Sequence, residues 1–111
     1  MDEIIKAVKL LAEEEKSRGD ALYGKNHSRH ESYAVLKEEL EECEDEMEGI
    51  YHKMERIWKM VKADAKQSDM LGELNALILN CLCMTAEAVQ VTAMAMKMHD
   101  FEEANNKSGI R

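Results

Sequence analysis

Three glutamates, Glu38, Glu39 and Glu42, stand close together in a segment of strong helix formers. Residues three or four apart lie on the same side of a helix, so Glu42 can direct its carboxylate toward that of Glu38 or Glu39. Like charges at this spacing repel each other, and a cation bound between them would remove the repulsion. The spacing is compatible with a metal site and also with a solvated acidic face, which is the commoner arrangement.

The composition predicts which elements carry these glutamates. The 111 residues include no proline and 5 glycines, and Ala, Leu, Met, Glu and Lys are abundant, which is typical of an all-α protein. The length favours one domain, which we expect over residues 1–101, followed by a flexible tail over residues 102–111. The net charge of −8 argues against binding to a nucleic-acid backbone, and it suits a cation or a basic partner.

The cysteines and the N-terminal segment indicate the cellular compartment of the protein. Cys43, Cys81 and Cys83 are odd in number and show no Cys-x-x-Cys spacing, so reduced thiols are expected rather than disulfides or a zinc site. The first residues are acidic and interrupted by charges, unlike a signal peptide, and no apolar run is judged long enough to span a membrane. We therefore expect a cytoplasmic protein.

Apolar periodicity predicts three helices. The first is expected from Asp2 to Arg18, with Gly19 at its end and a loop over residues 19–29. Ser28 is the expected N-cap of the second helix, with Glu31 three residues later. The second helix carries apolar residues in steps of four and three: Leu36, Leu40, Cys43, Met47, Ile50, Met54, Ile57 and Val61.

A polar turn over residues 62–69 separates this helix from a third, expected from Met70 to Phe101. The two long helices would form an antiparallel hairpin, and a turn centred near residue 66 or 67 places Glu87 level with Glu46 and Gln90 level with Cys43. Glu87 and Gln90 then approach the first group of glutamates from the facing helix. Carboxylates on two facing helices can supply the oxygen ligands that Mg²⁺ prefers.

The second half of the long helix is apolar on two sides. Tyr51 and Trp58 add a stripe beside the predicted seam, and Gly49 within the seam allows a local bend. A helix that is apolar on two sides needs two neighbours. We therefore expect an oligomer, either a homodimer or a homotetramer.

Two segments, HESYAVLKEELEECEDEM (residues 30–47) and AEAVQVTAMAMKM (residues 86–98), resemble the MazG-like all-α nucleoside triphosphate pyrophosphohydrolases, especially small phage and prophage members. The family pattern is Glu-Glu-x-x-Glu on one helix and Glu-x-x-Asp on a later one. The resemblance implies Mg²⁺, or Mn²⁺, and cleavage of a nucleoside triphosphate to monophosphate and pyrophosphate. It implies Glu39, Glu42 and Glu87 as metal ligands with Gln90 in the fourth position, and Glu38 as the water-activating base or a further ligand.

The chain departs from this family pattern in two places. Gln90 replaces the aspartate of the second motif, so this position offers a carbonyl oxygen without a charge, and the segment over residues 43–86 is long for the family. These departures support a second hypothesis, a non-catalytic acidic phage-type protein that binds and inhibits a host or defence protein. The retained Glu-Glu-x-x-Glu motif favours the enzyme.

Three basic residues near the motifs are candidates for contacting substrate phosphates: Lys37, His30 and Lys97. Each has an alternative role. His30 fits the start of a helix, and the two lysines fit surface ion pairs, which contribute ~0–1 kcal/mol each.

Overall fold

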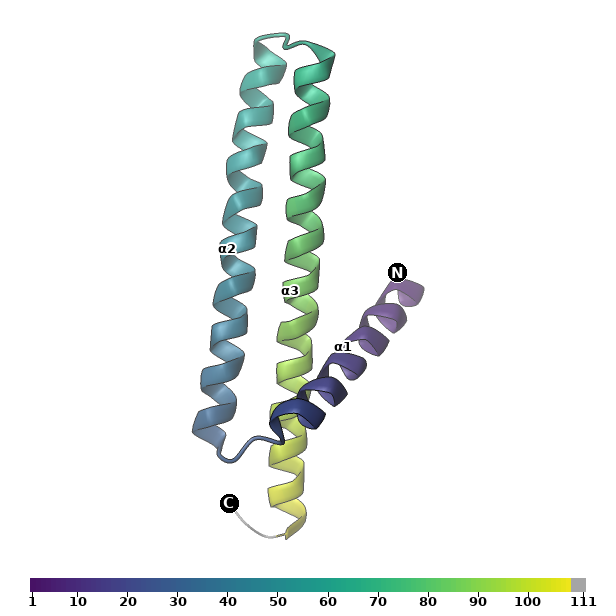
Figure 1. Cartoon of the computed structure of the whole chain (residues 1–111), viewed down its shortest axis with the longest axis vertical. Helices are drawn as coiled ribbons and strands as arrows, with labels where there is room; N and C mark the ends of the chain where they lie inside the picture. Colours follow the sequence, from purple (N-terminus) through teal and green to yellow (C-terminus); the bar gives the residue numbers. More distant parts are fainter. Residues whose placement is uncertain (109–111) are drawn as a thin grey trace.

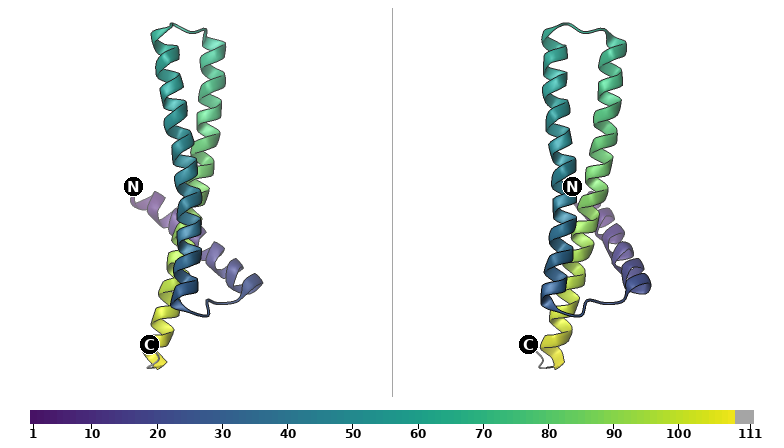
Figure 2. Two further views of the ribbon diagram at one scale, coloured as in Figure 1. Left: turned by 90° about the vertical axis from the view of Figure 1, so that its left-hand side faces the viewer. Right: turned by 60° about the vertical axis from the view of Figure 1, so that its left-hand side comes forward.

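The computed structural model describes the backbone of residues 1–108 and the side chains of residues 1–106. It contains three helices, α1 (Asp2–Tyr23), α2 (Arg29–Lys62) and α3 (Gln67–Ser108). Helices α2 and α3 form a long antiparallel hairpin, and α1 crosses the C-terminal half of α3 at an angle (Figures 1 and 2). The molecule is elongated, with extents of 64 × 28 × 24 Å. The predicted all-α fold built on a hairpin with an N-terminal helix is confirmed.

The first helix is longer than predicted. It continues through Gly19 to Tyr23 and ends at Gly24, whose φ of 77° lies in the region that glycine adopts without strain. The prediction of a loop from residue 19 was wrong because the first of the two glycines is helical and the second ends the helix. Residues beyond Gly19 also bind α3, since Asp20 Oδ1 lies 3.6 Å from Lys97 Nζ.

The start of α2 follows the predicted cap. Ser28 has an extended backbone, and its hydroxyl accepts a hydrogen bond of 3.0 Å from the backbone N–H of Glu31. The carboxylate of Glu31 in turn accepts from the backbone N–H of His27 at 3.3 Å. These bonds fix the entry of the chain into the helix that carries the glutamate motif.

The turn of the hairpin is shorter than predicted and lies earlier in the chain. It comprises residues 63–66, so its centre falls between Asp64 and Ala65. A centre two residues earlier shifts the pairing of the helices by about four residues, one helical turn. Cys43 Sγ accordingly lies 4.0 Å from the carbonyl oxygen of Met84, and the predicted pairing of Cys43 with Gln90 was wrong.

The third helix extends past both predicted ends. It starts at Gln67 and continues to Ser108, so residues 102–108 are helical. These residues belong to the segment predicted as a flexible tail, whose last residues, 109–111, lie outside the described part of the chain. The helix also contains a stretch that is apolar and long enough to cross a membrane by length and composition, contrary to the sequence-based expectation.

Gly49 of α2 allows the side chain of Asn80 on α3 to approach closely inside the hairpin. The side chain of Asn80 is buried opposite it, and a Cβ at residue 49 would lie 2.7 Å from Asn80 Oδ1. Asn80 Nδ2 donates to Glu46 at its carbonyl oxygen (2.9 Å) and carboxylate (2.8 Å), and its Oδ1 accepts from Lys53 Nζ at 2.9 Å. A buried asparagine with its hydrogen bonds satisfied favours one register of the two helices.

The described residues bury a very small apolar core. Only Ala12, Val89 and Ala93 are buried hydrophobic residues, and all three lie where α1 crosses α3 or close to it. The predicted seam of α2 is only half enclosed. Cys43, Ile50 and Ile57 are half-buried, while the alternate members of the seam are exposed: Leu40, Met47, Met54 and Val61.

Candidate metal centre beside a cavity

Three of the predicted ligands come together between α2 and α3. Glu39 and Glu42 lie one turn apart on α2, and Glu87 approaches them from α3. One carboxylate oxygen of each lies within 4.8 Å of those of the other two. The observed register, one turn from the predicted one, places Glu87 opposite Glu42 rather than Glu46.

Two members of the cluster, Glu39 and Glu87, hold their protons more tightly than isolated carboxyl groups do. Partial burial is the main cause that raises the pKa of Glu39 above its ordinary value of 4.5, followed by the charges of Glu42, Glu87 and Glu38. Burial also raises the pKa of Glu87, followed by the charge of Glu42 and a hydrogen bond with it. Mutual repulsion of this kind is what a bound cation would relieve.

The spacing of the oxygens fits a small hard cation. Mg²⁺ takes oxygen ligands at about 2.1 Å, so ligands on opposite sides of the ion are ~4.2 Å apart and adjacent ones are closer. Oxygens within 4.8 Å of one another need only small side-chain rotations to reach this range. Three carboxylates leave coordination positions for water or phosphate oxygens.

Gln90, the fourth predicted ligand, is bound to a residue that the motifs do not include. Its Nε2 donates a hydrogen bond of 2.7 Å to Glu15 Oε2 on α1. Glu15 is half-buried and also forms an ion pair with Arg18. A carboxylate from α1 therefore lies next to the position at which the family pattern has an aspartate.

A cavity of about 450 Å³ adjoins the cluster and has Glu39 and Gln90 in its wall. It lies between α1, the loop after it, and the facing parts of α2 and α3. Its wall contains three basic side chains (Arg18, Lys25 and Lys97) and three acidic ones (Glu15, Glu31 and Glu39). Apolar side chains, among them Leu22 and Met94, line the rest. A cavity of this size with a few charged groups is typical of a small-molecule site.

The structure separates the remaining predicted site residues. Lys97 lines this cavity and forms an ion pair with Asp20. Glu38 is exposed and lies outside the cluster, although its charge raises the pKa of Glu39. Lys37 is exposed and lines neither this cavity nor a second one, which has His30 in its wall.

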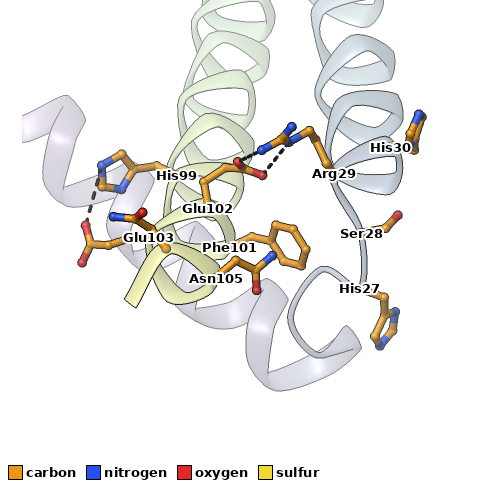
Figure 3. A pocket seen from close by; sticks show the side chains of 10 residues that line it. His27, Ser28, Arg29, His30, His99, Phe101, Glu102, Glu103 and Asn105 are labelled. Atoms are coloured by element: carbon orange, nitrogen blue, oxygen red, sulfur yellow. Dashed lines mark hydrogen bonds and ion pairs between the residues drawn. The ribbon is translucent and has the colours of Figure 1, made fainter. Parts of the chain in front are cut away.

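This second cavity, of about 740 Å³, lies between the start of α2 and the end of α3 (Figure 3). Arg29 donates to Glu102 through Nε (3.1 Å) and Nη2 (2.5 Å), which ties the two helices together. The ring of His30 points away from the side chains of α3. The charged groups here pair with each other, and the acidic cluster lies elsewhere.

Sequence reasoning missed Glu15 and Arg18. Both lie on α1, and their positions depend on how α1 crosses α3. A weak signal was present, because Glu15 and Arg18 are three residues apart and therefore share one side of a helix.

In comparisons with known proteins, no family model, curated protein or solved structure matches this chain.

Proposed function

We propose that the protein is a Mg²⁺-dependent, MazG-like nucleotide pyrophosphohydrolase that cleaves a nucleoside triphosphate to monophosphate and pyrophosphate. One observation carries the proposal: three carboxylates converge between two facing helices and adjoin a cavity whose wall includes three basic side chains. The cavity offers cations for phosphate oxygens and apolar side chains for a base or sugar.

In this proposal Glu39, Glu42 and Glu87 hold the metal, with the carbonyl oxygen of Gln90 as a neutral fourth ligand. Glu15, hydrogen-bonded to Gln90, supplies the negative charge that the glutamine lacks. A bound Mg²⁺ would screen the triphosphate and stabilise the charge that develops during its cleavage.

The reaction consumes one water. Its oxygen attacks the α-phosphorus, the bond from that phosphorus to the bridging oxygen breaks, and the electron pair leaves with pyrophosphate. Glu38 is the proposed base that takes the proton of the water, in keeping with its place in the motif, and Lys97 is the proposed contact for the phosphate chain.

The direct test incubates the protein with Mg²⁺ or Mn²⁺ and a panel of ordinary and modified nucleoside triphosphates. We expect stoichiometric monophosphate and pyrophosphate from at least one nucleotide, and a metal-dependent rise in melting temperature. Absence of both would refute the proposal and favour the second hypothesis, a protein that acts by binding a host or defence protein.

A further inference from the structure

A row of alternating charges joins α1 to α3 where the two helices cross (Figure 1). Asp100 of α3 pairs with Lys16 of α1, and Lys16 also pairs with Asp20 one turn later. Asp20 in turn pairs with Lys97 of α3. The exposed fraction of the side chains falls along this row, from 48% for Asp100 through 23% and 20% to 11% for Lys97. The charges therefore lead from solvent to the wall of the cavity beside the acidic cluster, which includes Lys97.

The outer and inner contacts of this row differ in geometry. Lys16 Nζ donates a hydrogen bond to Asp100 Oδ2, and this bond is the main cause that raises the pKa of Lys16 above its ordinary value of 10.5. By contrast, Asp20 Oδ1 lies 3.6 Å from Lys97 Nζ, and Asp20 Oδ2 lies 3.9 Å from Lys16 Nζ. Both distances are too long for a hydrogen bond. The inner contacts are therefore held by charge alone.

The carboxylate of Asp20 has an open acceptor. Its Oδ1 atom is buried and accepts no hydrogen bond from the described part of the chain. Because buried polar atoms are nearly always hydrogen-bonded, an atom left open in this way needs a physical reason. An ammonium group has three N–H donors, and this geometry attracts Lys97 without occupying any of them. All three stay available for a ligand in the cavity.

Lys97 depends on this neighbour for its charge balance. A lysine side chain that is 11% exposed has lost most of its contact with water, and a nearby carboxylate offsets that cost. Within the described residues, Asp20 is the acidic partner of Lys97, and Asp20 itself does not line the cavity. It can therefore hold the ammonium group without competing for the space that a ligand would occupy.

We propose that Asp20 is a positioning residue that holds the ammonium group of Lys97 ready for the phosphate chain of the substrate. This inference rests on the proposed function, in which Lys97 contacts the phosphates. Lys97 follows Gln90 by seven residues on α3, a rise of ~10 Å, so it acts on phosphates that lie away from the metal. Asp20 therefore controls how tightly the phosphate chain binds and leaves Mg²⁺ binding unchanged.

The direct test measures the affinity of the full chain for inorganic tripolyphosphate by calorimetry, together with the KM and kcat of pyrophosphate release. Asp20→Asn should weaken tripolyphosphate binding and raise KM by about 10-fold or more, the usual loss for a hydrogen bond to a charged group. We expect kcat to change by less than about threefold, the pattern for binding energy that ground state and transition state share. The affinity for Mg²⁺, titrated separately, should stay at the wild-type value.

Asp100→Asn is the matched control. It removes a carboxylate contact of the same kind between α1 and α3 and leaves the pair of Asp20 and Lys97 intact. A merely structural role for these contacts predicts that both variants lower the melting temperature and that neither changes tripolyphosphate affinity. We expect Asp100→Asn to behave in this way and Asp20→Asn to lose affinity as well.

A double-mutant cycle shows whether Asp20 acts through Lys97. Lys97→Met should weaken tripolyphosphate binding at least as much as Asp20→Asn does. Adding Asp20→Asn to Lys97→Met should then change the affinity by less than about twofold, because the group that Asp20 holds is already absent.

Asp20→Glu serves if Asp20→Asn releases α1 from α3. It keeps the charge, and its extra methylene group spans the gap of 3.6 Å, so its carboxylate can accept a hydrogen bond from Lys97 Nζ. The affinity for tripolyphosphate should fall by about threefold or more at an unchanged melting temperature, since phosphate must first displace this charge-assisted bond.

The outcomes separate this inference from the proposed function. Tripolyphosphate binding that depends on Asp20 and Lys97, without pyrophosphate release from any nucleotide, would refute the hydrolase and support the positioning role. Equal effects of Asp20→Asn and Asp100→Asn on affinity would overturn the positioning role, as would additive effects of Asp20→Asn and Lys97→Met. A wild type that binds no tripolyphosphate, or an Asp20→Glu variant with wild-type affinity, would also overturn it.

Discussion

Glu42 lies one helical turn from Glu39 and also approaches Glu87, so it links the two halves of the acidic cluster. We expect Glu42→Gln to lower pyrophosphate release by about 100-fold or more, because even residues that only support metal ligands cost 10–100-fold when they are lost. The Mg²⁺-dependent rise in melting temperature should disappear with it. Both are measured on the same preparation.

Glu41→Gln is the matched control for this variant. Glu41 is the exposed neighbour of Glu42 and lies outside the cluster, so its loss removes the same charge from the same helix. Equal losses of activity in the two variants would contradict a specific role for Glu42.

The pair formed by Gln90 and Glu15 allows a test in both directions. Gln90→Asp adds a charge to the fourth position, so Mg²⁺ affinity and turnover should rise. Without metal the melting temperature should fall, because two carboxylates then face each other where an amide now donates a hydrogen bond. Adding Glu15→Gln to Gln90→Asp should restore the metal-free melting temperature, since the amide and the carboxylate are exchanged across the same contact.

These two variants and their combination form a double-mutant cycle, read by calorimetry and by Mg²⁺ titration. Unchanged Mg²⁺ affinity in Gln90→Asp would show that residue 90 is not at the metal position.

At the scale of single residues, the sequence was sufficient to predict that Glu39, Glu42 and Glu87 come together. Helical spacing and an antiparallel hairpin bring them close even when the predicted register is wrong by one turn. The sequence was insufficient to predict that Glu15 contacts Gln90. The contact of Glu15 with Gln90 spans 75 residues and depends on the crossing of α1 over α3, which no periodicity in α1 determines.

Among the elements, the hairpin is organised around Gly49 and Asn80. Replacing a helical glycine by alanine normally stabilises the helix by up to about 1 kcal/mol. At residue 49, however, the new Cβ would lie 2.7 Å from the side chain of Asn80, which three hydrogen bonds hold in place. We therefore expect the change to destabilise the protein by about 1–3 kcal/mol, as overpacking does, measured by denaturant unfolding.

Gly72→Ala in α3 provides the control. Gly72 is helical and exposed, and a Cβ added there would meet no atom within 4 Å outside its own helix, so the helix preference should act alone. We expect a stabilisation of up to about 1 kcal/mol. If both variants stabilise the protein, the contact of Gly49 with Asn80 is not significant in solution.

The helices show which sequence signals are reliable. Ser28 is identifiable as a cap because its hydroxyl acts locally on the backbone of Glu31. Gly19 is a misleading signal for a helix end because glycine tolerates both helical and left-handed backbone conformations. The positive φ that ends α1 belongs to Gly24. The apolar residues of α2, spaced by four and three, were interpreted as one contact surface. A helix with this repeat can instead turn every second apolar residue toward a second neighbour.

For the whole molecule, the acidic cluster links stability to pH. Because the pKa values of Glu39 and Glu87 are raised in the folded state, the folded protein binds protons more tightly there than the unfolded chain does. This contribution to stability is fully present below the ordinary value of 4.5 and is lost as the pH rises through the raised pKa values. In metal-free buffer, the melting temperature of the wild type should therefore fall more steeply above pH 4.5 than that of Glu39→Gln.

Saturating Mg²⁺ should reverse this difference, because the metal binds the ionised carboxylates and competes with protons for them. We expect the rise in melting temperature caused by Mg²⁺ to be larger at pH 7.5 than at pH 5, and absent in Glu39→Gln at either pH. All samples are compared at one protein concentration, since association also shifts the melting temperature. A rise of equal size at both pH values, or one that persists in Glu39→Gln, would place the bound metal outside the cluster of Glu39, Glu42 and Glu87.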